Sequence, residues 1–164
     1  MDQFSLIPYV WVSVFLVVCA ACDFYHAKLS NKFIVFSFIV SICCLFIFNP
    51  ADTWLISLSS FILMFTVGFL SFKFRILGGG DIKALCIVAI FLTPIQLKDF
   101  VLYSLLWSGT YALIFYLISG QVLSVITNTI GVYRKFAVAD HKIPFTFGLL
   151  FGWLSLFTMG VLTW

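Results

Sequence analysis

Glutamate is missing from this chain, and charge of either sign is scarce. Of 164 residues, only 9% are charged, whereas 63% are hydrophobic and 21 are phenylalanine. A soluble domain of this size has too little interior to bury so much apolar surface. A polytopic membrane protein fits the composition instead. The formal net charge of +3 then reports orientation in a bilayer, and we expect no nucleic-acid partner.

Cysteine and signal-peptide patterns are also incomplete. Cys19 and Cys22 form one C-x-x-C pair, but no second pair completes a zinc site, and all five cysteines lie in apolar runs. We therefore expect no metal, no cofactor and no disulfide framework. The N-terminus lacks both a basic segment and a small-residue cleavage site, which argues against a cleaved signal peptide. No soluble domain interrupts the sequence, so residues 1–164 are expected to form a single membrane-embedded domain.

Long apolar runs predict an all-α polytopic membrane protein with six transmembrane helices. The runs are residues 4–22, 33–48, 53–72, 82–93, 100–119 and 144–162. The fourth is too short to span comfortably unless it tilts, lies in thinned bilayer or is partly re-entrant. Residues 121–142 have one apolar and one polar helical face, which predicts an amphipathic helix at the cytoplasmic interface. The alternative is a cytoplasmic continuation of the fifth helix.

Basic residues are distributed unevenly between the two sides of this topology. Eight of the nine fall in the connections after the first, third and fifth helices, and only Lys98 lies opposite. The positive-inside rule places the eight in the cytoplasm, so six spans leave both termini outside. Asp23, at the end of the first helix, and Asp81, at the start of the fourth, then share the cytoplasmic edge. Asp140 is also on this side, where we interpret it as a solvated charge near Lys142.

Asp23 and Asp81 each have an ordinary structural interpretation. Asp23 suits an ion pair with Lys28 or Lys32, and Asp81 suits the N-cap of the fourth helix. Together, however, two carboxylates in one low-dielectric cleft do not both ionise easily, so one holds a proton. The ionised partner then accepts a proton from water, while the protonated partner polarises a peptide carbonyl. This is aspartic peptidase chemistry, which needs neither a metal nor a covalent intermediate.

The glycines before Asp81 suit the same chemistry. Gly78, Gly79 and Gly80 lack a Cβ, which permits close approach of an extended peptide and unusual φ angles. A flexible hinge is the alternative interpretation. Two further functions remain open: a small transporter or channel that relays ions or protons through Asp23 and Asp81, and a noncatalytic assembly scaffold.

The residues around these acids resemble those of a known family. Gly78-x-Gly80-Asp81-x-Lys83 resembles the GxGD motif of the type IV prepilin peptidases, which are intramembrane aspartyl proteases. In this family, an aspartate at the end of the first helix is followed by a basic stretch and Ile-Pro-Asn. Here Lys28, Leu29, Ser30 and Asn31 follow Asp23 at matching offsets. Near the C-terminus, the segment that resembles the family's Pro-aromatic-Gly motif comprises Ile143, Pro144, Phe145 and Gly152. Ser30 replaces the usual proline and Thr146 the usual glycine, and neither departure touches a candidate acid.

The resemblance implies a function and a set of site residues. Asp23 and Asp81 would be the catalytic pair, and the supporting residues would be Gly78, Gly79, Gly80, Lys83, Asn31 and Pro144. The substrate would be a prepilin or pseudopilin, cleaved at the cytoplasmic face of the bacterial inner membrane for type IV (Flp/Tad-like) pilus biogenesis or type II-like secretion. Membrane lipids are the other expected partner, and the oligomeric state is open.

Larger members of this family carry a cytoplasmic segment with two C-x-x-C pairs and methylate the new N-terminus. The sequence has no such segment, and in this it resembles the short TadV/CpaA-like subgroup. That likeness implies cleavage without N-methylation.

Overall fold

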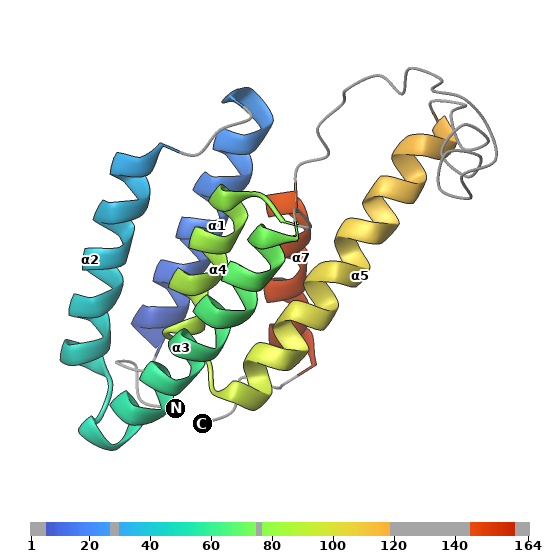
Figure 1. Cartoon of the computed structure of the whole chain (residues 1–164). Helices are drawn as coiled ribbons and strands as arrows, with labels where there is room; N and C mark the ends of the chain where they lie inside the picture. The colour runs from blue at the N-terminus through green and yellow to red at the C-terminus, as the bar shows by residue number, and fades with distance from the viewer. Residues whose placement is uncertain (1–5, 27–29, 75–76, 119–144, 160–164) are drawn as a thin grey trace.

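The structure is a bundle of antiparallel helices. The computed structural model describes residues 6–26, 30–74, 77–118 and 145–159. These residues form six α-helices and no strand, which confirms the all-α prediction. The helices are α1 (Leu6–His26), α2 (Asn31–Phe48), α3 (Ala51–Lys73), α4 (Gly79–Ala89), α5 (Pro94–Ile118) and α7 (Phe145–Thr158). Successive helices alternate in direction, so α1 ends, α4 begins and α7 begins at one end of the bundle, which we call the site end (Figure 1).

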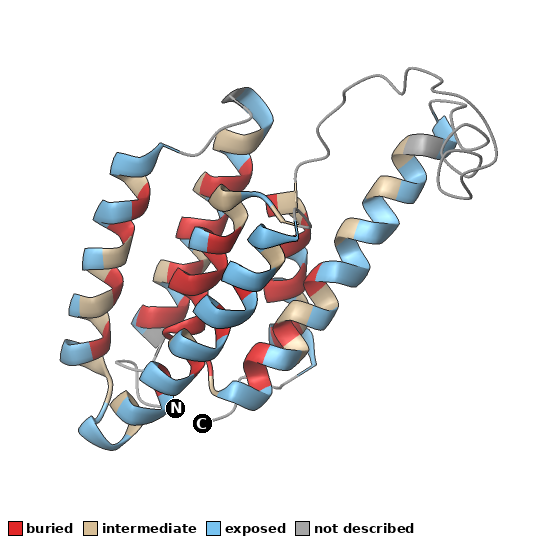
Figure 2. Cartoon of the chain, viewed as in Figure 1, coloured by how far each residue is buried: buried red, intermediate tan, exposed pale blue. Residues whose placement is uncertain are grey.

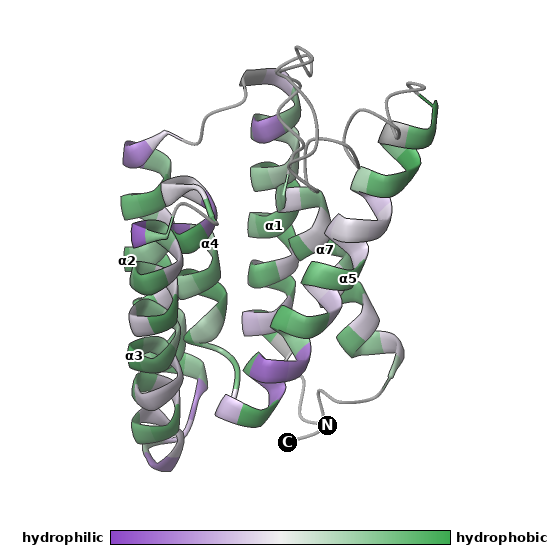
Figure 3. Ribbon diagram, turned by 45° about the vertical axis from the view of Figure 1, so that its right-hand side comes forward, coloured by the Kyte–Doolittle hydropathy of each residue, from purple (hydrophilic) through white to green (hydrophobic). Residues whose placement is uncertain are grey.

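The outer surface of the bundle is apolar, as expected for a protein surrounded by lipid. Large hydrophobic side chains are exposed along the outward faces of the helices, among them Phe36, Phe46, Leu55, Phe65, Leu106 and Leu113. Hydrophilic positions gather near the helix ends (Figure 3). Within the described residues, three segments are long and apolar enough to cross a bilayer: Ile7–Tyr25, Asn31–Phe48 and Ala51–Lys73. The chain is therefore a membrane protein, because soluble monomers rarely expose so many large apolar side chains and these three segments are long enough to cross a bilayer.

Helix boundaries near the two acids differ from those predicted. α1 continues beyond residue 22 to His26, so Asp23 lies inside its last turn. α4 begins at Gly79 rather than at residue 82, so Asp81 is its third residue and Gly78 takes the N-cap position predicted for Asp81.

The connection between α4 and α5 was also predicted incorrectly. α4 ends at Ala89 rather than at residue 93, and α5 begins at Pro94 rather than at residue 100. Proline is favoured in the first helical turn, where its missing N–H would have no helical partner. The predicted amphipathic helix at 121–142 lies outside the described residues.

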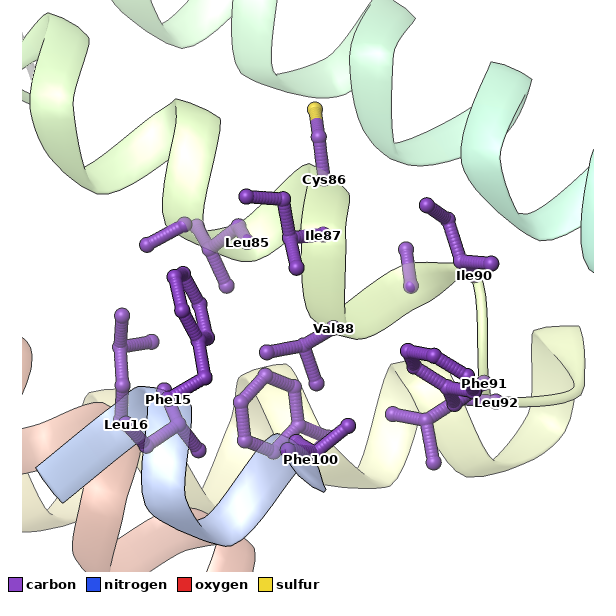
Figure 4. Packing of buried hydrophobic residues seen from close by; sticks show 14 of the residues in the cluster. Phe15, Leu16, Leu85, Cys86, Ile87, Val88, Ile90, Phe91, Leu92 and Phe100 are labelled. Carbon is purple, nitrogen blue, oxygen red and sulfur yellow. The ribbon is translucent and has the colours of Figure 1, made fainter. Parts of the chain in front are cut away.

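α4 is the central helix of the bundle and packs against α1, α2, α3 and α7. Its residues Ile82 and Ala84–Ala89 are all buried (Figure 2). Phe15 and Leu16 of α1 and Phe100 of α5 close around it (Figure 4). A helix that is apolar on every side is stable in this position because other helices surround it.

The length of α4 also explains why it does not cross a bilayer by itself. Its 11 residues extend about 16 Å at 1.5 Å per residue, about half of the hydrocarbon core. The connection that follows it is buried at Ile90, Phe91 and Leu92. Irregular backbone is tolerated within a membrane protein where protein rather than lipid surrounds it.

Three tryptophan indoles bind neighbouring helices together. Each indole N–H donates a hydrogen bond to a serine hydroxyl of another helix. The pairs are Trp11–Ser41, Trp153–Ser13 and Trp107–Ser155, at 2.9, 2.9 and 2.8 Å. Such bonds connect α1 with α2, α7 with α1, and α5 with α7, and they satisfy polar groups that lipid cannot satisfy.

α5 and α7 approach each other closely because their contact is lined by small residues. A Cβ on Gly148 would lie 2.7 Å from both the backbone oxygen of Ser104 and the Cβ of Ser108. A Cβ on Gly152 would lie 2.8 Å from the backbone nitrogen of Ser104. Small residues four positions apart on both helices permit this approach. The contact fixes α7, and therefore the residues at its start, against the rest of the bundle.

Candidate active site

Asp81 is positioned by the first turn of α4. Gly78 is the N-cap residue, and Asp81 is the third residue of the helix. The carboxylate of Asp81 accepts a hydrogen bond from the backbone N–H of Gly78. This is the returning half of a capping box, in which the third side chain satisfies the N-cap N–H. The capping interaction is therefore present, with Asp81 as the returning side chain and not as the cap.

Gly78 is required for close approach rather than for an unusual backbone conformation. Its φ of −72° is accessible to any residue, so the backbone at this position does not need a glycine. A Cβ on Gly78, however, would lie 2.9 Å from Oδ2 of Asp81. A Cβ on Gly79 would meet only Cε2 of Phe72 at 3.6 Å, an ordinary contact. Of these two glycines, Gly78 is the one whose size determines where the carboxylate lies.

Asp23 is held from the opposite side by the start of α7. Thr146 Oγ1 donates a hydrogen bond to Asp23 Oδ2 at 2.8 Å. Thr146 is the second residue of α7 and is fully buried. The bond joins residues 123 positions apart in the sequence. Asp23 itself is half-buried, near the end of α1.

The structure brings the two acids within electrostatic reach of each other. Burial, followed by the negative charge of Asp23, raises the pKa of the Asp81 carboxyl to about 6, although the Gly78 N–H acts in the opposite direction. Asp81 lies outside the three candidate membrane spans. Cys19 lies one turn before Asp23 and is fully buried. It interacts electrostatically with both acids. Asp23 and Asp81 therefore form an electrostatically interacting pair, in which the charge of Asp23 favours a protonated Asp81.

Two of the predicted supporting residues contact each other beside this pair. Lys83 Nζ donates a hydrogen bond to Asn31 Oδ1 at 2.8 Å, and both residues are exposed. Asn31 is the first residue of α2 and Lys83 lies in α4, so the bond connects the two helices at the site end. Gly79 and Gly80 open α4 and are half-buried. Pro144 lies outside the described residues, as does Asp140.

A comparison with known protein families identifies the family to which these two acids belong. Residues 10–117 match the model of the Type IV leader peptidase family, which covers more than half of the chain and includes both acids. The chain belongs to this family. The resemblance noted from the GxGD segment is thereby confirmed at the family level. No curated protein and no solved structure matches the chain.

Membership in the leader peptidase family indicates an aspartic-type peptidase embedded in a membrane. The family match ends at residue 117, so α7 and its Thr146 lie beyond it. Within the matched segment, the interacting acids of this leader peptidase come from α1 and α4.

The contact between Thr146 and Asp23 was not predicted from the sequence. Thr146 was identified only as a departure from the family pattern, at a position where glycine is usual. A signal was nevertheless present, since Thr146 begins the last helix at the membrane depth predicted for Asp23. A hydroxyl at that depth, in a position where most relatives are expected to have no side chain, is a candidate hydrogen-bond donor to a neighbouring acid.

Proposed function

We propose that this leader peptidase is an intramembrane aspartic endopeptidase that removes the leader peptide from prepilins or pseudopilins. Cleavage takes place at the cytoplasmic face of the inner membrane, during Flp/Tad-like pilus biogenesis or type II-like secretion, and the product is not methylated. The observation that carries the proposal is the interacting pair Asp23 and Asp81 in a chain of the Type IV leader peptidase family.

In the first step, water adds to the scissile peptide. The ionised carboxylate of the pair takes one proton from a water molecule while the water oxygen bonds to the peptide carbonyl carbon. The protonated carboxyl gives its proton to the carbonyl oxygen. The product is a neutral gem-diol, and the two acids have exchanged protonation states.

In the second step, the gem-diol collapses. The carbon–nitrogen bond breaks, and the departing amine nitrogen takes the proton that the first acid removed from water. The second acid removes a proton from one diol hydroxyl, which leaves a carboxyl group on the leader. Each acid thus returns to its starting state, and the sum of the steps is one peptide bond hydrolysed by one water.

The position of the pair supports this chemistry. Asp23 is half-buried and Gly78 is exposed, so water has access to this end of the bundle. The described lysines near this end, Lys32, Lys73 and Lys83, are exposed, in keeping with a cytoplasmic orientation. A substrate helix that ends at this depth would present its leader junction to the two acids.

Co-expression with a candidate prepilin tests the proposal. Mass spectrometry of the recovered pilin should show loss of the leader only when the wild-type peptidase is present, and the new N-terminus should carry no methyl group. Purified protein in proteoliposomes provides the second arm. Ion or proton flux that needs no peptide, together with failure to cleave any prepilin offered, would contradict the proposal and favour a transporter.

A further inference from the structure

We propose that Thr146 is a positioning residue that orients the Asp23 carboxylate toward the attacking water, while Asp81 acts as the proton donor. This inference rests on the proposed peptidase function and assigns the two roles within the pair. Asp23 takes the proton from the attacking water, and Asp81 donates its proton to the peptide carbonyl oxygen.

The geometry of the hydrogen bond supports the assignment. The Thr146 hydroxyl donates to Asp23 Oδ2 at 2.8 Å, and Thr146 is fully buried, so water does not replace this donor. Hydrogen bonds to carboxylates are stronger than those between neutral groups, so this donor holds the Asp23 carboxylate in one orientation.

The fold holds the donor in place. Thr146 lies in the first turn of α7, and α7 is fixed against α5 by the close contact at Gly148 and Gly152. The indole of Trp153 also connects α7 to Ser13 of α1, the helix that carries Asp23. Because α1 and α7 are joined in this way, the distance from hydroxyl to carboxylate is set by packed helices and not by a loop.

The surroundings of Asp81 are different. Asp81 also accepts a hydrogen bond, from the Gly78 N–H, and this bond favours its ionised form. Burial and the charge of Asp23 act against ionisation and outweigh it, so the pKa of Asp81 is raised. The charge of Asp23 therefore favours a protonated Asp81, which is the state that a proton donor needs.

Two substitutions separate a donor role from a packing role. Thr146→Val keeps the shape and removes the hydroxyl, whereas Thr146→Ser keeps the hydroxyl and removes a methyl group. Thr146→Val should lower kcat by roughly 10- to 100-fold with KM nearly unchanged. Thr146→Ser retains the donor and should keep most of the wild-type rate.

The controls distinguish this inference from the proposed function. Wild-type protein that cleaves no prepilin would overturn both. Wild-type protein that cleaves, together with kcat and KM values of Thr146→Val equal to those of wild type, would overturn only the role of Thr146. Equal losses of kcat in Thr146→Val and Thr146→Ser would show a packing role and likewise overturn it. If Thr146→Val does not accumulate as folded protein, Thr146→Ala provides the same comparison with Thr146→Ser.

Discussion

The substitution Gly78→Ala tests whether the first glycine of the GxGD motif is required because it leaves room for the Asp81 carboxylate. The new Cβ would lie 2.9 Å from Asp81 Oδ2, closer than ordinary contacts between carbon and oxygen. The backbone at Gly78 accepts alanine without strain, since its φ is −72°. The carboxylate of Asp81 is therefore the group that must move, and it moves away from the Gly78 N–H.

The expected size of the effect follows from that displacement. Relief of the contact requires a shift of about half an ångström, and a misplacement of about 1 Å in a reacting group costs up to about 100-fold in rate. We therefore expect Gly78→Ala to lower kcat for leader cleavage by roughly 10-fold. Stability should change little, because alanine at an N-cap costs only about 1 kcal/mol relative to better caps.

The assay is cleavage of a purified prepilin in detergent micelles, followed by mass spectrometry, with Gly79→Ala as the matched control. A Cβ on Gly79 meets only Phe72, at 3.6 Å, so this variant should cleave at close to the wild-type rate. Equal rates for Gly78→Ala and wild type would refute the reasoning. So would an equal loss in Gly79→Ala, because the effect would then reflect chain flexibility and not the space beside Asp81.

Two further predictions concern stability. Gly152→Ala should lower the free energy of unfolding by about 1–3 kcal/mol, because the new Cβ meets the backbone of Ser104. The control is Gly109→Ala, since a Cβ at Gly109 has no neighbour within 4 Å. In thermal unfolding, this control should be neutral or slightly stabilising. Native Asp81 holds its proton to a higher pH than the unfolded chain does, so the free energy of unfolding should fall as pH rises from 3.8 to about 6. Asp81→Asn should remove this decline, and an unchanged decline in that variant would assign it to another group.

The helices and the shared depth of the two acids were predictable because hydrophobic length is a strong signal in a membrane protein. The apolar runs by themselves predicted that Asp23 and Asp81 lie at the same end of the bundle. The orientation of that end relative to the cytoplasm stays a prediction based on the distribution of lysine and arginine.

Helix ends near the acids were harder to predict because local polar groups, not hydropathy, determine them. Gly79 and Gly80 are poor helix formers, yet the bond from the Gly78 N–H to Asp81 stabilises a helix that includes them. The fourth apolar run, residues 82–93, ends just before Pro94, yet proline is equally suited to the first turn of the next helix, α5. The bond from Thr146 to Asp23 depends on the packing of α7 against α1, which no local pattern encodes.

Initial cleavage rates of Asp23→Asn and Asp81→Asn test the central claim most directly. Both substitutions preserve shape and remove the ability to hold or transfer the shared proton. Asp99→Asn is the matched control, because Asp99 pairs with Lys98 in the first turns of α5, at the other end of the bundle. We predict loss of leader cleavage in the first two variants, with insertion and folding retained, and wild-type rates in the control. Cleavage at close to the wild-type rate by either Asp23→Asn or Asp81→Asn would contradict the account.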